Sequence, residues 1–240
     1  MIGKLEPAFP SSTGPDDYYD EFEEHAGIGG IAQGRFIVHT KGMRDQSMHE
    51  VQIDYQGAEI DKTKNTFIKR GTFTDVERSI EGYANQGITS LYLMGTLERD
   101  NYPFLNNYSN EIEYRKEDAS PLASVDRSRA NKMLGGEEGL KKIMLKAKTH
   151  KVKIITDALA RISSSRHSRK YKDLLLNYLD EDGRVHICYG TDGQARKFED
   201  TAMLNYRKIE AWEILIEEVL EFTQKFGVDG IHLDNGQAWP

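Results

Sequence analysis

Two aspartates stand at the ends of short apolar runs, and together they could carry acid–base or nucleophilic chemistry. Asp157 ends the run KVKIITD, and Asp234 ends the run GIHLD. If these runs are neighbouring strands of one parallel sheet, both carboxylates emerge at the same edge of it. Glycoside hydrolysis uses such a pair, one as nucleophile or charge stabiliser and the other as general acid. An aspartate after a strand is also a common helix N-cap, so the spacing alone leaves both roles open.

The elements around these aspartates repeat as a helix, a short turn and an apolar run. Apolar residues recur at helical spacing over 72–86, 137–150 and 210–226, and the apolar runs 88–94, 151–157 and 230–234 follow them. Such a repeat is typical of an α/β protein with a parallel sheet. In the first helix, Thr74 and Glu77 are expected to form a capping box. The segments 35–40 and 50–55 are predicted to be short strands that precede it.

Two long segments, 95–135 and 158–208, each follow the carboxyl end of a predicted strand. In parallel α/β folds this edge of the sheet carries the active site, and long βα loops usually build it. Both long loops are therefore expected at the edge of the sheet that carries the active site. The basic segment RISSSRHSRKYK (161–172) lies in the second of these loops. It is interpreted as a solvated loop, with a grip on a phosphate or an acidic surface as the alternative.

Composition argues against several classes of protein. The 240 residues carry a formal net charge of −7, which disfavours a nucleic-acid-binding protein. The chain has no apolar run near the roughly 20 residues of a membrane span, and Cys188 is the only cysteine. No metal-ligand spacing occurs, and GIGGIA (27–32) is interpreted as a hinge because no buried strand precedes it. We therefore predict a cytoplasmic protein without a cofactor, a metal, a nucleic-acid partner or a membrane partner.

Four passages, in the same order along the chain, resemble the catalytic (β/α)8 barrel of the α-amylase superfamily of glycoside hydrolases. They are RGTFTDVERSIEGYANQGITSLYLM (70–94), ASPLASVD (119–126), GGEEGLKKIMLKAKTHKVKIITDAL (135–159) and LNYRKIEAWEILIEEVLEFTQKFGVDGIHLDN (204–235). The resemblance implies an α/β fold of the TIM-barrel type, of which about the first four β/α units are present, with long βα loops. Two parts are expected: a flexible acidic N-terminal segment (1–33), because its composition is acidic and turn-forming, and a partial amylase-like barrel (34–240).

The resemblance further implies roles for particular residues. Asp234 falls on the position of the catalytic nucleophile, and Asp157 falls on a third-strand aspartate that supports the active site. His232, Asp126 and Arg161 fall on positions expected to contact the substrate. His232 replaces an arginine two residues before the nucleophile, so an always-charged guanidinium gives way to a group that titrates near neutrality. Arg161 stands where the family has the asparagine of an Asn-His pair.

The chain also departs from the family's complete catalytic set. The family's general-acid glutamate lies on the fifth barrel strand, whereas this sequence ends after the fourth. Four strands of an eight-stranded barrel leave two open edges, which are costly in water. We therefore expect either a missing C-terminal half or protein partners to complete the barrel. The expected function is related to hydrolysis or transfer of α-glucan, with no turnover by this chain. The alternative is a non-catalytic structural or interaction module in a larger assembly.

Overall fold

The computed structural model describes residues 47–63, 66–99, 120–164, 166–191 and 197–234. Four features expected from the sequence therefore lie wholly or partly outside the described residues. They are the acidic segment 1–33, the GIGGIA hinge, the predicted strand 35–40 and much of the loop 95–135. No helix within the described ranges is long and apolar enough to span a membrane.

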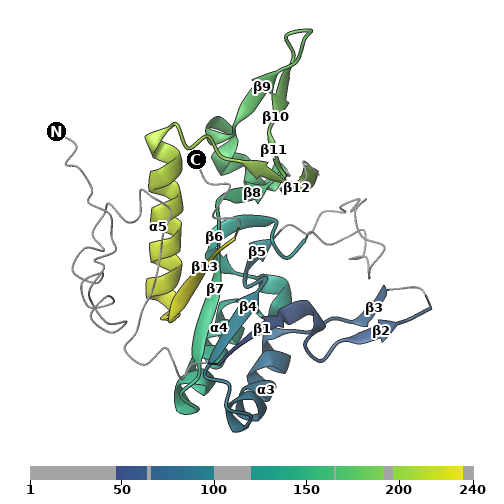
Figure 1. The fold of residues 1–240 in the computed structure, drawn as a ribbon, viewed down its shortest axis with the longest axis vertical. Helices are drawn as coiled ribbons and strands as arrows, with labels where there is room; N and C mark the ends of the chain where they lie inside the picture. The colour runs from purple at the N-terminus through teal and green to yellow at the C-terminus, as the bar shows by residue number, and fades with distance from the viewer. Residues whose placement is uncertain (1–46, 64–65, 100–119, 165, 192–196, 235–240) are drawn as a thin grey trace, which may run out of the picture. The chain divides into compact units, whose positions relative to one another are not determined.

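A four-stranded parallel sheet forms the centre of the fold (Figure 1). Its strands, in the order in which they lie, are β1 (Met48–Gln52), β4 (Ser90–Met94), β7 (Lys153–Leu159) and β13 (Gly230–Asp234). One helix connects each pair of neighbouring strands: α3 (Phe73–Asn85), α4 (Gly136–Thr149) and α5 (Ile209–Phe226). Each strand thus lies beside its sequence neighbour, which is the winding of a (β/α) barrel.

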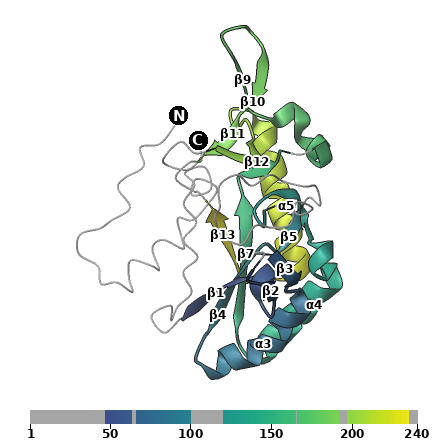
Figure 2. The same cartoon turned by 90° about the vertical axis from the view of Figure 1, so that its right-hand side faces the viewer.

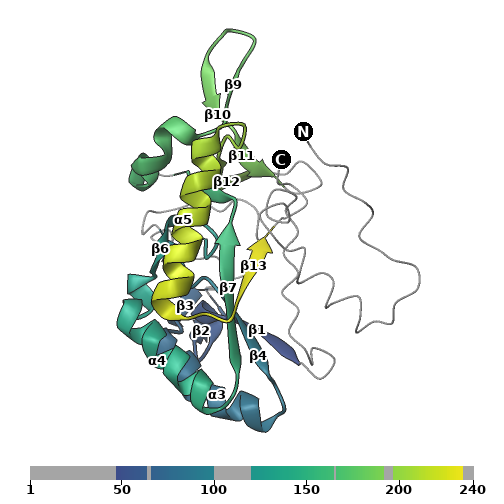
Figure 3. The ribbon, with the colours of Figure 1, turned by 90° about the vertical axis from the view of Figure 1, so that its left-hand side faces the viewer.

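All three helices lie on one side of the sheet (Figure 2, Figure 3). Alternate strand residues face them, and we call this side the outer face; it includes Val51, Leu91, Leu93 and Ile154, all of them buried. Apolar side chains of the helices complete this core, among them Val76, Ile80, Leu140, Ile143, Phe222 and Phe226. The helical periodicity predicted in the sequence is confirmed, because the apolar stripe of each helix packs on this face.

The opposite side of the sheet, which we call the inner face, carries a different set of side chains. The strand register places Glu50, Tyr92, Ile155, Asp157, His232 and Asp234 on it. Polar and charged groups therefore follow one another across the side of the sheet that the helices do not cover. In a (β/α)8 barrel the corresponding side faces the barrel axis.

Four local details differ from the sequence-based expectation. The predicted strand 50–55 is a strand only as far as Gln52, because Ile53–Tyr55 form a 3-10 helix. The segment 161–172 is not a solvated loop throughout, because Arg161, Ile162, Ser163 and Tyr171 are buried.

The first helix has its capping box two residues earlier than predicted, because the Asp75 carboxylate accepts hydrogen bonds from the backbone N–H of Thr72 at 3.0 Å and from its hydroxyl at 2.7 Å. Thr74 and Glu77 were therefore the wrong pair. Strand β7 also runs two residues past Asp157, so this aspartate lies inside the strand and does not end it.

The loops at the carboxyl edge contain short antiparallel strands. After β4, β5 (Leu97–Arg99) pairs with β6 (Ser124–Ala130). After β7 come β8 (Arg161–Ser163), the 3-10 helix η4 (Arg166–Leu174), β9 (Asn177–Leu179), β10 (Val185–Ile187), β11 (Tyr189–Thr191) and β12 (Lys197–Met203). The remaining elements are η2 (Ile53–Tyr55), β2 (Glu59–Asp61), β3 (Thr66–Lys69) and η3 (Lys132–Leu134). Figure 1 shows the β9–β10 hairpin extending away from the sheet. The expectation that long βα loops follow the strands is thus confirmed.

Candidate active site

Asp157 lies on the inner face near its carboxyl edge and contacts three other residues there. Its side chain is only 2% exposed. One carboxylate oxygen accepts a hydrogen bond from the Tyr92 hydroxyl, and the other accepts one from the backbone N–H of Gly95 at 3.2 Å. Nδ1 of His232 lies 3.3 Å from the first of these oxygens. Burial raises the pKa of Tyr92, and the neighbouring Asp157 carboxylate raises it further, so Tyr92 remains a hydrogen-bond donor.

His232 packs between Asp157 and the ring of Tyr92. Its ring centroid lies 4.4 Å from that of Tyr92, and its side chain is 44% exposed. The hydrogen bond to Asp157 raises the pKa of His232, and this effect outweighs the opposite effect of partial burial. His232 is therefore a hydrogen-bond partner of Asp157 on the neighbouring strand, because the strand register places the two residues opposite each other.

Asp234 has a different partner. The Arg161 guanidinium, from β8, lies 2.9 Å from a carboxylate oxygen of Asp234. The Asp234 side chain is 23% exposed and that of Arg161 is 9% exposed, so the cation is the more buried member of the pair. Asp234 lies opposite Leu159, two residues beyond Asp157 along β7, a rise of about 6.6 Å. The two aspartates therefore share a face and an edge, each with its own cationic or titratable partner.

Asp126 lies in another cluster of the same loops. Its carboxylate accepts hydrogen bonds from the backbone N–H and hydroxyl of Ser128, and it lies 3.2 Å from the ammonium group of Lys170. Burial would raise the pKa of Asp126, but the hydrogen bonds from Ser128 and the charge of Lys170 outweigh burial and lower it. The role of Asp126 in contacting a substrate stays a prediction.

Sequence reasoning missed three residues that organise the site. In the sequence, Tyr92 looks like one more apolar residue of a strand. Because alternate residues of SLYLM point to opposite faces, Tyr92 lies on the inner face. Arg127 and Glu218 form a buried ion pair at 3.0 Å, from β6 and α5. A glutamate on the apolar stripe of a helix was a signal that a partner cation had to exist. Within the described ranges, no group of three His, Cys, Asp or Glu side chains is placed to hold a metal ion.

The parallel sheet, its one-sided helices and the aspartates at its carboxyl edge define the class of the fold, a partial (β/α) barrel. Solved structures of α-amylases share it. The chain matches a maltogenic α-amylase from Thermotoga neapolitana at 17% identity and a TM-score of 0.59, covering 82% of this chain and 41% of that one. The α-amylase of Lactobacillus plantarum matches at 20% identity and a TM-score of 0.58, covering 82% and 40%.

A third α-amylase, from Geobacillus thermoleovorans in complex with acarbose, matches at 14% identity and a TM-score of 0.60, covering 84% of this chain and 42% of that one. The chain thus spans about two fifths of the length of these enzymes. No protein-family model matches the sequence, and no curated protein does. The predicted fold, the first part of an amylase-type barrel, is confirmed.

Proposed function

We propose that the inner face of this sheet forms one half of an α-glucan-binding site, with Asp234 as its central carboxylate and without turnover by this chain. The observation that carries the proposal is the shared edge of the inner face, where the contacts among Tyr92, Asp157 and His232 lie two residues along the strands from the Arg161–Asp234 ion pair. A sugar ring offers hydroxyl groups and a weakly apolar face, which suit charged side chains beside an aromatic residue. The α-amylases that share the fold support the glucan as ligand.

Within this site, Asp157 has an organising role. It accepts hydrogen bonds from Tyr92 and Gly95 and contacts His232, so both of its carboxylate oxygens are engaged within the protein. A general acid must instead present a proton to the leaving oxygen of the substrate. Asp157 therefore fits the role of holding Tyr92 and His232 in place, in agreement with the supporting role that the family resemblance implies.

The placement of carboxyl groups among the described inner-face residues supports the absence of turnover. Retaining glycosidases need two carboxyl groups about 5–5.5 Å apart. Both carboxylate oxygens of Asp157 already accept hydrogen bonds within the protein. Glu50 lies at the same level of the sheet as Ile155 and Gly230, four residues before Asp234 along the strands. That offset corresponds to about 13 Å along the strands. Glu50 is therefore too far along the strands to act as a general acid for Asp234.

Calorimetric titration of the full chain with acarbose and with maltotetraose tests the proposal. We expect binding of both ligands, a loss of at least tenfold in affinity for Asp234→Asn, equivalent to about 1.4 kcal/mol, and no release of reducing sugar. Asp182→Asn makes the same chemical change on the exposed hairpin and is the matched control. Failure of the parent chain to bind, or equal binding by Asp234→Asn, would overturn the glucan site. Reducing sugar released by the parent but not by Asp234→Asn would overturn the non-catalytic part.

A second function, that of an interaction module, has one observation in its favour. Within the described residues, β1 pairs with β4 alone and β13 pairs with β7 alone, so both outer strands offer an edge. Met48 on β1 is 63% exposed. Such edges pair readily with another strand. This function would be favoured over the first if the protein bound no glucan and light scattering showed that it forms a complex of defined size with a second copy or another protein.

A further inference from the structure

We propose that Arg161 is a positioning residue for Asp234 and that a buried ion pair, Arg127–Glu218, holds the backbone of Arg161 in place. The guanidinium beside Asp234 comes from β8, at the position where the family resemblance led us to expect an asparagine. The charge expected at position 232 is thus supplied to Asp234 from another strand. The inference deepens the proposed function, but its physical claim can be tested without a sugar.

The geometry of the pair favours orientation of the carboxylate. The Arg161 side chain is 9% exposed, and its Nη2 lies 2.9 Å from Oδ2 of Asp234. A buried guanidinium is planar and offers its donors in a fixed arrangement, so it fixes the orientation of a carboxylate better than a flexible ammonium group. Asp200 is a further carboxyl group that interacts with Arg161. Burial raises the pKa of Asp200, and Ser120 and Arg161 oppose this effect.

Buried side chains bind the three successive carbonyl groups that lead into β8. Arg127 Nη1 donates to the carbonyl of Leu159 at 3.0 Å and to that of Arg161 at 3.3 Å. The hydroxyl of Tyr206 donates to the carbonyl of Ala160 at 2.6 Å. Side-chain hydrogen bonds to every carbonyl of this turn leave its backbone little freedom, which is what a positioning residue requires of its support.

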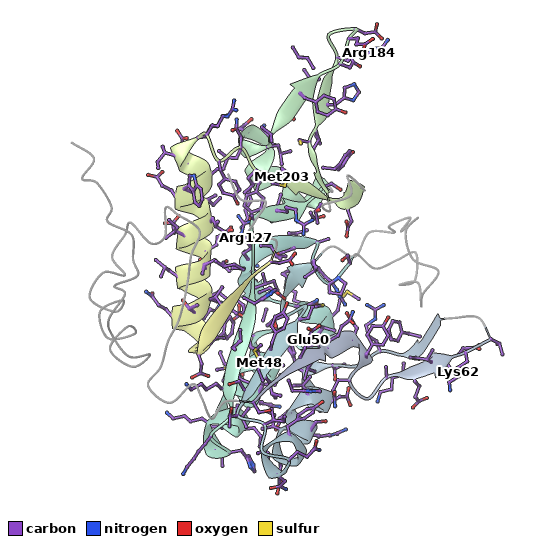
Figure 4. All side chains as sticks on the ribbon, viewed as in Figure 1. Met48, Glu50, Lys62, Arg127, Arg184 and Met203 are labelled. Carbon is purple, nitrogen blue, oxygen red and sulfur yellow. The ribbon has the colours of Figure 1, made fainter. Side chains whose placement is uncertain are left out.

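Arg127 is itself held by α5. Its Nε lies 3.0 Å from Oε2 of Glu218, while the other carboxylate oxygen of Glu218 accepts hydrogen bonds from Tyr171 and Lys170, both at 2.6 Å. Figure 4 shows Arg127 between α5 and the strands of the sheet. A buried charge is costly unless it is paired and hydrogen-bonded, and these contacts satisfy that requirement for Glu218. The ion pair thus connects α5 to the turn that presents Arg161.

Carbodiimide-driven amidation of the full chain, read by tandem mass spectrometry, measures how freely Asp234 reacts. Asp229 lies five residues earlier in the same stretch of sequence and provides the internal reference, because its carboxylate accepts the backbone N–H of Ile154 and has no part in the pair. We expect Arg161→Gln to raise the labelling of Asp234 relative to Asp229 at least threefold. Arg161→Lys, which keeps the charge but not the fixed arrangement of donors, should label Asp234 to a degree between that of the parent and that of Arg161→Gln.

Two further variants separate positioning from general loosening of the loop. Arg127→Met removes the donors to the turn while leaving Arg161 in the sequence, and we expect it to raise Asp234 labelling in the same direction as Arg161→Gln. Asp200→Asn changes a further carboxyl group that interacts with Arg161 and should leave the labelling ratio unchanged. Unchanged labelling in Arg161→Gln, or an equal rise in Asp200→Asn, would overturn the inference.

The labelling experiment and the glucan titration can fail separately. A threefold rise in labelling together with no glucan binding by the parent would support the positioning role and overturn only the proposed function. Glucan binding that weakens in Asp234→Asn together with unchanged labelling in Arg161→Gln would overturn only the positioning role. If both hold, Arg161→Gln should weaken maltotetraose binding by at least fivefold, and Arg161→Lys should recover part of that loss.

Discussion

The two faces of the parallel sheet differ in what they bury and in what they can do. The outer face is apolar and closed by helices, with Leu91, Leu93 and Ile154 fully buried. The inner face alternates with it along the same strands and carries Tyr92, Asp157 and Asp234. Because successive strand residues point to opposite sides, one short segment such as KIITDAL serves both faces at once. Apolar burial is concentrated on one side of the sheet, and ionisable side chains are concentrated on the other.

Substitution of two adjacent isoleucines on β7, one at a time, should show the largest difference in stability between the two faces. Ile154→Ala removes a buried side chain from the helix-covered core and should lower the free energy of unfolding by about 3 kcal/mol. Ile155→Ala makes the same change one residue later, on the half-buried inner face, and should cost less than half as much. Urea denaturation of both variants measures this. Equal losses would contradict the assignment of the two faces.

A smaller effect should come from the inner face alone, through the titration of His232. Its pKa is raised in the folded state by the hydrogen bond to Asp157. A raised folded-state pKa adds stability that is fully present below about pH 6.5, the unfolded value, and is lost as the pH rises through the folded value. Among the described residues, the groups that interact with His232 include the carboxylates of Asp157, Asp234 and Glu50 and the ring of Tyr92.

Because His232 is nearly half exposed, solvent screens the pair, and we expect a fall in the thermal midpoint of no more than about 2 °C. His232→Gln should remove this fall. Thermal melts of the parent and of His232→Gln from pH 5.5 to pH 8.5 measure the difference. A midpoint that falls equally in both proteins, or rises with pH only in the parent, would contradict the assigned pair.

The outer face could be predicted from the sequence and most of the inner face could not. Helical periodicity located the helices α3, α4 and α5, and the apolar runs located β4, β7 and β13, whereas β1 was predicted at 50–55 and lies at Met48–Gln52. The same signal misread α5, where Glu218 lies on the buried stripe, because periodicity does not reveal a partner such as Arg127, 91 residues away. It also placed Asp157 at the end of its strand, since an aspartate often ends one, although β7 continues to Leu159.

The partners of the two aspartates required the structure. The family resemblance led us to Asp234, Asp157, His232 and Arg161 as separate positions, but it implied neither the pairing of Arg161 with Asp234 nor that of His232 with Asp157. Those pairings depend on the register of β13 against β7 and on the path of the turn into β8. Neither quantity leaves a local trace in the amino-acid sequence.

We propose that glucan binds to the inner face of the sheet and not elsewhere on the described chain. Methyl NMR of the isoleucine-labelled protein tests it most directly, because Ile154 and Ile155 are adjacent residues on opposite faces. On addition of maltotetraose we predict that the methyl signal of Ile155 shifts while that of Ile154 does not, and that Asp234→Asn suppresses the shift. A shift at Ile154 without one at Ile155, or shifts confined to Ile187 of the β9–β10 hairpin, would contradict the account.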